Sequence, residues 1–490
     1  MDIERKTLKD TSLKEKTING MLWSFFERFG YLAIQFSTNI ILARLLTPRD
    51  FGLIGMMMVF IGLSTILVDG GLGAALIQRK KPTKKDYSTI FYINIFMSLL
   101  LYGVLFISSN SISKFYSQPQ LELMLKVIGI VLITDSFNIV QNNILIKNLE
   151  FKKISKIKII SVFLASVLGI ISALNGLGVW SLVIQYLSNS IFRTLFLWLK
   201  STWFPLLSFS INSFKNLYGF GFKLLAASLL SELYRSFQTL LIGKYFSSQE
   251  LGFFTQAKQL QGVPTTALMM VVNQVTFPIF SQLQNKPKKL IIGFKKSLKS
   301  LVFVNFPLMI LMATIAKPLF TLLFTEKWLP SVPFFQLLSL GFGLLLVVHS
   351  LNLNIIKSLG RSDIVLKLEI IKKILGVSLI VFFLQFGIEG ILIALAINSV
   401  LEFFLNGYFT KKLIGYSILN QLKDILPTLL LSSTIGLFVW YVFNENEITP
   451  LFLIIIQSII FIALYFIGAV LLKFEAFKIY LTIIKNKLKK

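Results

Sequence analysis

The sequence predicts an all-α polytopic membrane protein with about fourteen transmembrane helices. Hydrophobic residues make up 55% of the 490 residues, and the mean hydropathy is +0.76. Apolar stretches of about 20 residues recur along the whole chain, and each is long enough to cross a bilayer as a helix. These stretches lack the alternation of apolar and polar residues that strands of a membrane barrel show, so we expect helices.

The predicted spans are joined by short connections, and no extramembrane domain is expected on either side. The first apolar run starts near Gly20. It is too long for a cleavable signal peptide and lacks a small-residue cleavage site, so we expect it to form the first span. In chain order the spans cover residues 20–43, 51–77, 87–108, 121–145, 156–175, 178–199, 216–243, 251–280, 297–317, 331–356, 364–386, 388–410, 425–443 and 450–472.

The basic residues support this order of spans. Of the 49 Lys and Arg residues, 35 lie in the two termini and in every second connection, whereas 6 lie in the other connections. Cytoplasmic connections of membrane proteins are enriched in Lys and Arg. The alternation therefore predicts an even number of spans with both termini in the cytoplasm.

The net charge of +27 could suggest a nucleic-acid partner. The Lys residues, however, form short clusters between spans rather than one basic face, which argues against nucleic acid and favours attraction to anionic membrane lipids. The chain has no Cys. Disulfides, thiolate catalysis and cysteine metal sites are therefore excluded.

Two copies of one short segment lie 200 residues apart. Residues 44–52 read RLLTPRDFG and residues 244–252 read KYFSSQELG. Two weaker correspondences follow: NNILIK at 142–147 with NLNIIK at 352–357, and GV at 178–179 with GI at 390–391. Internal repeats of this kind indicate that spans 1–6 correspond to spans 7–12.

The repeat defines the expected domain organisation. Six spans are an even number, so both halves enter the membrane in the same sense and the pseudo-two-fold axis must lie along the membrane normal. A central cleft is expected between the two six-helix lobes. The predicted parts are an N-terminal lobe, a C-terminal lobe, and two further helices with a basic cytoplasmic tail, at residues 1–200, 201–412 and 413–490.

Both copies of the repeated segment contain a capping box. Thr47 is followed three residues later by Asp50, and Ser247 by Glu250. The hydroxyl can accept from a backbone N–H three residues on, while the carboxylate reaches back. Pro48 then falls at the first helical position, where a missing N–H costs nothing. Helix capping explains these turns, and a gating role is the alternative.

Three predicted spans carry a polar stripe on one helix face. Spacings of three and four residues place such side chains above one another on a helix. Together the stripes predict a shared wet cavity between the lobes. They are Ser24, Arg28, Tyr31, Gln35 and Thr38 in span 1, Asp135, Asn138 and Asn142 in span 4, and Ser228, Glu232, Arg235 and Thr239 in span 7.

Buried charges in a membrane are costly and are functional candidates by default, but each basic residue also has a structural interpretation. Arg28 has Glu27 beside it, and could pair structurally or extend to the membrane surface. Arg235 lies one turn from Glu232, which could be its ion-pair partner. Arg193 lies near a cytoplasmic end, where extension to the surface explains it best.

The remaining charged positions are equally open. Lys258 lies about two turns from an external end, and Asp69 precedes two glycines, where it could mark a break in span 2. Glu402 is a candidate proton or cation site or half of a buried pair. His349, the one histidine of the chain, is expected to be simply hydrogen-bonded, and Lys372 and Lys373 could pair with Glu369.

No enzyme motif supports catalysis. The chain has no GxxxxGK[ST] loop, no His/Asp/Glu cluster at metal-ligand spacing, and no set for a Ser/His/Asp triad. It also lacks the long external loop that a membrane glycan polymerase or ligase would need. We therefore expect a protein that is not an enzyme and that uses neither a cofactor nor a metal.

Three segments resemble bacterial polysaccharide exporters. They are NIILARLLTPRDFG at 39–52, DGGLGAALIQR at 69–79 and FPIFS at 277–281. The chain is thus similar to the oligosaccharidyl-lipid and polysaccharide branch of the multidrug/oligosaccharidyl-lipid/polysaccharide flippase superfamily, which includes O-antigen, colanic-acid and teichuronic-acid exporters. The resemblance covers essentially the whole chain. It implies an outward flip of an undecaprenyl-pyrophosphate-linked glycan across the bacterial cytoplasmic (inner) membrane.

The resemblance supplies scaffold motifs and no binding residues, so the site is inferred from depth and polarity. Basic residues outnumber acidic ones at depth, and Arg matches phosphate oxygens well. We expect the pyrophosphate to be bound by basic side chains and the glycan by amides in the central cavity. The expected binding residues are Arg28, Arg235, Lys258, Gln35, Asn138 and Asn142, and the candidates for ion coupling are Asp69, Asp135, Glu232 and Glu402.

The leading hypothesis is a flippase for O-antigen, capsule or exopolysaccharide precursors that works by alternating access. The expected partners are the lipid-linked oligosaccharide, membrane lipids and polysaccharide polymerase or assembly proteins. A cation-coupled drug or small-molecule antiporter on the same scaffold is the alternative, and it should have an acid-dominated cavity. A membrane glycan polymerase or ligase is the third class.

Overall fold

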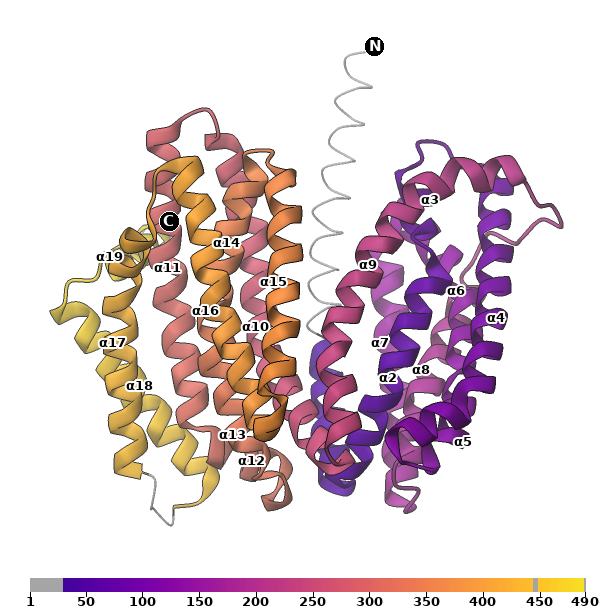
Figure 1. Ribbon diagram of the computed structural model, residues 1–490, viewed down its shortest axis with the longest axis horizontal. Helices are drawn as coiled ribbons and strands as arrows, with labels where there is room; N and C mark the ends of the chain where they lie inside the picture. The colour runs from indigo at the N-terminus through magenta and orange to yellow at the C-terminus, as the bar shows by residue number, and fades with distance from the viewer. Residues whose placement is uncertain (1–29, 444–447, 489–490) are drawn as a thin grey trace. The chain divides into compact units, whose positions relative to one another are not determined.

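The computed structural model describes residues 30–443 and 448–488, which form helices and no strand. A helix at residues 30–45 comes first (Figure 1). The following elements are α2 (Pro48–Asp69), α3 (Leu72–Gln78), α4 (Lys84–Tyr116), α5 (Gln120–Ile128), α6 (Ile130–Lys147), α7 (Phe151–Leu174), α8 (Trp180–Leu199), α9 (Ile211–Tyr245), α10 (Ser248–Leu283), α11 (Pro287–Thr314), α12 (Ala316–Phe324), η1 (Glu326–Trp328), α13 (Ser331–Leu337), η2 (Leu338–Gly343), α14 (Leu344–Ser358), α15 (Ser362–Phe383), η3 (Leu384–Phe386), α16 (Gly387–Ile414), α17 (Ile418–Phe443), α18 (Pro450–Leu471) and α19 (Glu475–Leu488).

These helices confirm the all-α membrane class. Within the described residues, eleven helical segments are long and apolar enough to cross a membrane. One of them, Ser362–Ile414, covers two predicted spans. The predicted span 216–243 lies in the long helix α9, and the predicted span 20–43 lies partly outside the described residues.

The chain forms two compact units, Met1–Gly252 (unit 1) and Phe253–Lys490 (unit 2). In unit 1, α9 packs against α2, α3 and α4. Glycines explain the close packing. A Cβ added to Gly71, at the start of α3, would lie 2.2 Å from the carbonyl oxygen of Gly221 in α9. The predicted repeat pattern assigned α9 to the C-terminal half, and sequence could not show this packing.

Both predicted capping boxes are present. The backbone N–H of Thr47 donates to Asp50 Oδ2 at 2.8 Å, and that of Ser247 donates to Glu250 Oε2 at 2.9 Å. The helices that follow, α2 and α10, meet at two glycines in matching positions of the repeated segment. A Cβ on Gly52 would lie 1.7 Å from the Ser248 carbonyl oxygen, and one on Gly252 would lie 1.8 Å from that of Pro48.

The predicted break in span 2 occurs at Asp69. There α2 ends, and Gly70 and Gly71 adopt left-handed backbone angles with φ of +58° and +71° before α3 begins. The far end of α3 is closed by Lys147 from α6. Its Nζ donates to the backbone carbonyls of Leu76, Ile77 and Arg79. A cation at a helix C-terminus satisfies the free carbonyls and complements the helix dipole.

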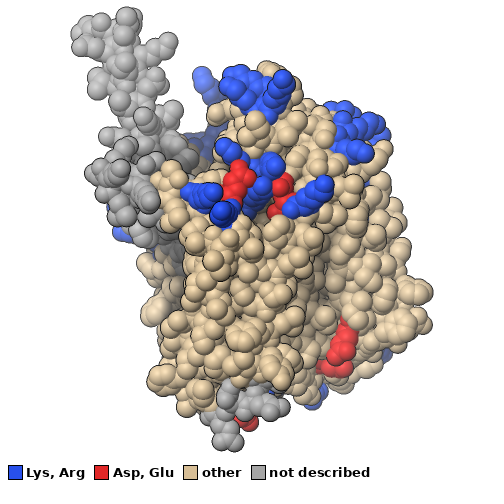
Figure 2. Space-filling view, turned by 90° about the vertical axis from the view of Figure 1, so that its left-hand side faces the viewer, with Lys and Arg blue, Asp and Glu red and all other residues tan. Residues whose placement is uncertain are grey.

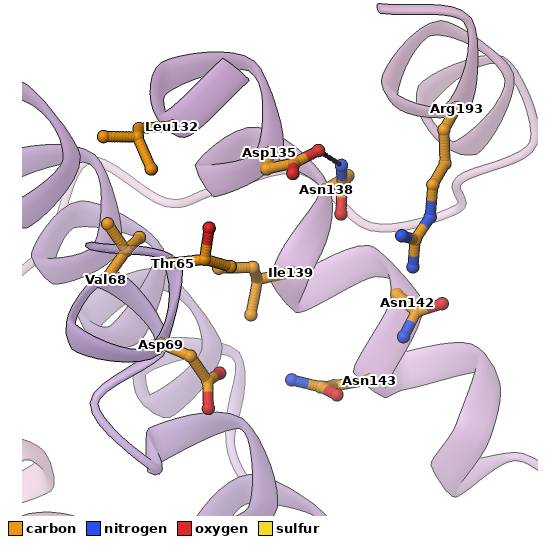
Figure 3. Close-up of a pocket in the computed structure, with 10 residues that line it drawn as sticks. All are labelled: Thr65, Val68, Asp69, Leu132, Asp135, Asn138, Ile139, Asn142, Asn143 and Arg193. Carbon is orange, nitrogen blue, oxygen red and sulfur yellow. Dashed lines mark hydrogen bonds between the residues drawn. The ribbon is translucent and has the colours of Figure 1, made fainter. Parts of the chain in front are cut away.

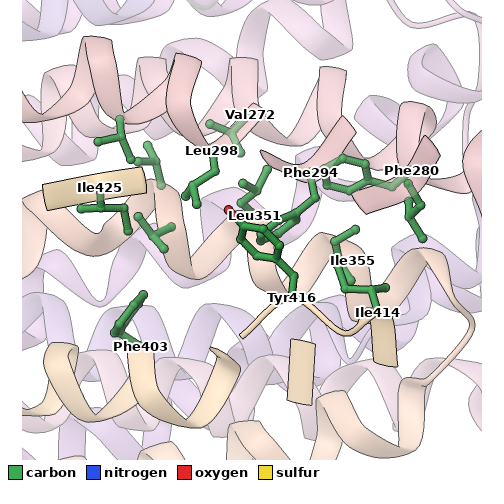
Figure 4. Packing of buried hydrophobic residues seen from close by; sticks show 14 of the residues in the cluster. Val272, Phe280, Phe294, Leu298, Leu351, Ile355, Phe403, Ile414, Tyr416 and Ile425 are labelled. Atoms are coloured by element: carbon green, nitrogen blue, oxygen red, sulfur yellow. The ribbon is translucent and has the colours of Figure 1, made fainter. Parts of the chain in front are cut away.

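Each unit has its own apolar core. In unit 1, residues of α3, α4, α6 and α9 pack around Phe91 and Trp203. In unit 2, a larger cluster joins α10, α11, α14, α16 and α17 around Phe294, Leu351 and Tyr416 (Figure 4). Both cores lie within the apolar, membrane-spanning parts of the helices. Polar groups at the same level in the membrane have no water to bind, so they need hydrogen-bond partners in the protein.

Helix α17 is fixed to α14 by a reciprocal pair of amides. Asn352 Nδ2 donates to Gln421 Oε1 at 3.0 Å, and Gln421 Nε2 donates to Asn352 Oδ1 at 3.2 Å. Thr410 from α16 also donates to Asn352 Oδ1, at 2.5 Å. Both amide side chains are fully buried. The last helices are therefore an integral part of unit 2.

Charged residues are segregated along unit 2. Figure 2 shows Lys and Arg gathered at one end of the visible face, with a few acidic residues among them and a broad uncharged region beside them. One such cluster joins α11, α17 and α19. There Lys299 Nζ lies 3.1 Å from Asp424 Oδ1 and 2.9 Å from Glu475 Oε2.

Candidate functional site

A polar pocket lies inside unit 1, among helices that are otherwise apolar (Figure 3). Its volume is about 220 Å³. Two carboxylates, one guanidinium and three carboxamides dominate its lining, an unusual composition at membrane depth. We call it the α6 pocket because α6 supplies most of its walls. Its lining residues are Thr65, Val68, Asp69, Leu132, Asp135, Asn138, Ile139, Asn142, Asn143 and Arg193.

The polar stripe of α6 forms one wall of this pocket. Asp135, Asn138 and Asn142 all line it, as their helical spacing predicted. Asp135 Oδ1 accepts hydrogen bonds from Asn138 Nδ2 at 3.0 Å and from Ser190 Oγ of α8 at 2.6 Å. Asn138 also donates to Thr194 Oγ1 at 3.0 Å. These bonds hold α6 against α8 and fix the orientation of the carboxylate.

Asp69 forms the opposite wall at the break between α2 and α3. Its carboxylate accepts from the backbone N–H groups of Gly71 and Gly73, which begin α3. A Cβ on Gly73 would lie 2.6 Å from Asp69 Oδ1 and 2.5 Å from Asn143 Nδ2. Only glycine therefore lets Asp69 and Asn143 approach α3 together. The two backbone N–H groups therefore anchor the Asp69 carboxylate at the start of α3.

Arg193 of α8 points into the pocket from the side of Asn142 and Asn143 (Figure 3). Its buried Nε has no hydrogen-bond partner among the described residues. The sequence interpretation, in which this side chain extends to the membrane surface, missed its place in the pocket. Its position about one helical turn after Ser190 and one residue before Thr194 was the available signal.

The α6 pocket can bind a small cation or a proton. Two carboxylates and one guanidinium leave one net negative charge when all are ionised. Carboxylate and carboxamide oxygens are the ligands that hard cations prefer. Arg193 supplies a fork of N–H donors that suits an anionic oxygen instead. Within the described residues, no group of three His, Cys, Asp or Glu side chains is placed to hold a metal ion.

The predicted pair on α9 is formed in unit 1. Arg235 makes an ion pair with Glu232, whose Oε1 also accepts from Ser236 at 3.1 Å. The two partners differ greatly in exposure, with 72% of the Arg235 side chain exposed but 9% of that of Glu232. Glu232 also lies against α2, because a Cβ on Gly62 would lie 3.0 Å from its Oε1.

The other predicted site residues lie apart from the α6 pocket. Gln35 is half-buried on the helix at residues 30–45, and Arg28 lies outside the described residues. Lys258 belongs to α10 in unit 2, where its Nζ lies 5.3 Å from the ring centre of Phe254. Glu402 is in α16, also in unit 2. The pocket thus unites Asp69, Asp135, Asn138 and Asn142 of the predicted set, and adds Arg193.

A bundle of apolar helices with a polar pocket inside one unit defines the chain as a polytopic membrane protein of transporter architecture. The family described as "Polysaccharide biosynthesis protein" matches residues 41–333. The chain belongs to this family.

Curated relatives match most of the chain. The teichuronic acid biosynthesis protein TuaB of Bacillus subtilis is 25% identical over 89% of this chain and 91% of its own length. The lipopolysaccharide biosynthesis protein WzxC of Escherichia coli is 27% identical over 87% of this chain and 89% of its own. The succinoglycan biosynthesis transport protein ExoT of Rhizobium meliloti is 23% identical over 66% of this chain.

Solved structures confirm the fold. The lipid II flippase MurJ, in an inward closed conformation, aligns with a TM-score of 0.72 and 16% identity over 93% of this chain and 98% of its own. An inward-facing multidrug resistance MATE family transporter aligns with a TM-score of 0.57 and 18% identity over 78% of this chain and 95% of its own. At these identities the likeness concerns the fold alone.

Proposed function

We propose that this protein is a flippase that moves an undecaprenyl-pyrophosphate-linked oligosaccharide across the bacterial cytoplasmic membrane for surface polysaccharide synthesis. The observation that carries the proposal is the match of nearly the whole chain to two relatives named for teichuronic acid and lipopolysaccharide biosynthesis. The basic connections support an orientation with both termini in the cytoplasm. Polysaccharide polymerase and assembly proteins are the proposed partners.

Arg235 is the proposed contact for the pyrophosphate. Its side chain is 72% exposed, so it can turn toward an incoming phosphate. Glu232 is buried and retains Ser236 as a donor, so the carboxylate keeps a partner when Arg235 leaves it. Exchange of a carboxylate for a phosphate suits Arg because its planar fork fits both groups. Arg28 and Lys258 are proposed to contact the same headgroup, and Gln35 the glycan.

The α6 pocket is the proposed site for coupling to an ion gradient. Asp69 and Asp135 face it from two different helices, and Asn138 and Asn142 supply further oxygens. A cation or proton bound there would offset the net negative charge of the lining. Asp69 is anchored to the start of α3 and Asp135 to α8. A cation or proton in the pocket would compete with both sets of hydrogen bonds and so alter how α3 and α8 are held.

Alternating access is the proposed mechanism, with the substrate headgroup crossing between two six-helix lobes while the polyprenyl chain stays in lipid. A ligand shifts such an equilibrium only by its differential affinity for the two states. Headgroup binding therefore promotes the outward flip only through charged contacts that are tighter in the state that opens away from the cytoplasm.

The test is the fate of the lipid-linked oligosaccharide in a strain that lacks the gene, with the two leaflets resolved. We expect the intermediate to accumulate on the cytoplasmic leaflet and surface polysaccharide to disappear. Complementation with Arg235→Ala should fail although the protein reaches the membrane, whereas Lys223→Ala, an exposed cation on the same helix, should restore export.

Unchanged surface polysaccharide and unchanged intermediates, in a strain without a second exporter, would overturn the flippase proposal. A screen for drug or cation sensitivity would then test the antiporter alternative. Full export by the Arg235→Ala variant would leave the flippase proposal in place and remove Arg235 from the headgroup site.

A further inference from the structure

A second polar cluster lies in unit 2, and the proposed mechanism does not yet use it. His349 of α14 is 6% exposed, and its Nδ1 lies 3.5 Å from Glu402 Oε2 of α16. Its Nε2 lies 3.3 Å from Ser399 Oγ. Glu402 Oε1 accepts from Asn398 Nδ2 at 2.9 Å. Both ring nitrogens and both carboxylate oxygens therefore face a polar neighbour inside an apolar bundle.

The contact between Nε2 and Ser399 accommodates two protonation states of the ring without moving its heavy atoms. A neutral ring with its proton on Nδ1 directs that N–H toward Glu402 and leaves Nε2 to accept from Ser399. A second proton on Nε2 makes the ring a donor on both sides, and the Ser399 hydroxyl then accepts. A serine hydroxyl rotates freely between these roles, so Nε2 has a partner in both states, whereas Nδ1 lies near the Glu402 carboxylate without a hydrogen bond to it.

The charges around the pair act in opposite directions on a protonated ring, since Lys372 repels it and the Glu402 carboxylate attracts it. The charged groups that face it from the packed helices are Lys372 and Glu369 of α15. Lys372 is 5% exposed and donates to Glu369 Oε1 at 2.7 Å. With His349 neutral, the two carboxylates and one ammonium group leave a net charge of minus one. One added proton makes the cluster neutral, and uncompensated charge at membrane depth is costly.

We propose that His349 and Glu402 form a proton-binding site in unit 2, in which the loaded state is an imidazolium paired with the Glu402 carboxylate. The added proton bonds to Nε2 of His349, and the proton on Nδ1 remains directed at Glu402. Proton access is by way of Glu402, whose side chain is 21% exposed, compared with 8% for His349. This site is distinct from the α6 pocket, which belongs to unit 1.

The chain has one histidine, and this makes the site directly observable. Protein labelled with ¹⁵N and ¹³C at histidine alone, purified with an affinity tag that contains no histidine and placed in lipid bilayers, gives one set of imidazole NMR signals. A titration over about three pH units on either side of the ordinary histidine pKa of about 6.5 reports which ring nitrogens carry protons. We expect a change from one protonated nitrogen to two as the pH falls.

Two variants should shift the proton affinity of His349 in opposite directions. Glu402→Gln removes the carboxylate that stabilises the imidazolium, so the proton affinity should fall at least about tenfold, or one pH unit. Lys372→Met removes a repelling positive charge, so the affinity should rise. A ring that stays neutral throughout, or a titration that Glu402→Gln leaves unchanged, would overturn the proposal. Because the pair of variants predicts opposite signs, a general loss of structure cannot imitate the result.

The role of this proton in transport rests on the proposed function and is tested separately. Transport of a lipid-linked oligosaccharide in proteoliposomes should respond to a pH gradient in the wild type and lose that response in His349→Gln. The NMR titration uses no glycolipid, so it can succeed when the flippase proposal fails. If transport responds equally to the pH gradient in the wild type and in His349→Gln, the site binds a proton but does not couple it to transport.

Discussion

The crossing of α2 and α10 predicts that alanine is not tolerated at two matched glycines. A Cβ on Gly52 or Gly252 would lie 1.7 or 1.8 Å from a backbone carbonyl oxygen, whereas real Cβ contacts essentially never fall below 3.0 Å. The separation of the two backbones would have to increase by more than 1 Å. Both obstructing atoms belong to backbone, so no side-chain rotation can relieve the contact.

The expected loss of folding stability follows from the known cost of overpacking a protein interior. Adding a methyl group to a well-packed interior costs about 1–3 kcal/mol, and here the rigid obstacle puts the cost at the upper end, about 3 kcal/mol. Gly262→Ala in α10 is the matched control, because nothing lies within 4 Å of its added Cβ. In that helix interior alanine should instead stabilise by up to about 1 kcal/mol.

Thermal unfolding of purified protein in detergent measures the difference. Gly52→Ala and Gly252→Ala should each lower the Tm relative to the wild type, while Gly262→Ala should leave it unchanged or raise it. The double variant Gly52→Ala/Gly252→Ala should be less damaging than the sum of the two, since the first substitution already separates the helices. Single variants as stable as the Gly262→Ala control would refute the close crossing.

Three further predictions concern single contacts. Lys147→Met should destabilise the protein by about 1–2 kcal/mol, seen as a lower Tm than in an exposed control such as Lys85→Met, because three carbonyls near the end of α3 lose their donor. Asn352→Leu should cost about 1–3 kcal/mol, again as a lower Tm, because Gln421 is left buried without its partner; a Gln421→Met second change should recover part of that loss. The hydrogen bond from Lys299 holds the pKa of Glu475 below its ordinary value, so this contact should stabilise α19 above about pH 4.3 and be lost as the pH falls through the lower folded-state pKa. The measurement is amide hydrogen exchange of α19 in wild type and Glu475→Gln at the same pH; we expect a small difference at neutral pH, worth less than about 1 kcal/mol, and none in strong acid.

Each of these three has a contradicting result. Equal Tm values for Lys147→Met and its control would mean that the end of α3 is satisfied without the ammonium group. A Tm for Asn352→Leu at or above the wild-type value would show that the amide pair is not needed to hold α17. Identical exchange of α19 in both proteins at neutral pH would exclude the Glu475 contact.

Local features of the fold were predictable because their signals are short in sequence. The capping boxes at Thr47 and Ser247 depend on residues three positions apart, and the break after Asp69 depends on two consecutive glycines. Helical spacing also predicted that Asp135, Asn138 and Asn142 share a face. In each case the interacting atoms belong to one helix or to its first turn, so the distance along the chain defines the distance in space.

Contacts between helices were not predictable in the same way. Arg193 seemed to belong to a membrane surface, since depth along a helix does not reveal which face meets a pocket. His349 and Glu402 lie on different helices, and nothing in the sequence pairs them. The close approach of α9 to the start of α3 likewise depends on Gly71 and Gly221, which lie 150 residues apart in the sequence.

The amide pair between α14 and α17 has a consequence for how the protein is made. A chain enters the membrane from its N-terminus, so Asn352 arrives before Gln421. Thr410 and the Val348 carbonyl already give Asn352 partners before α17 is synthesised. The hydrogen bonds of the Gln421 side chain go to Asn352, so before docking Gln421 would face hydrocarbon alone. Biogenesis of the last helices should therefore finish by docking onto a completed six-helix lobe, and a chain cut before α17 should still insert.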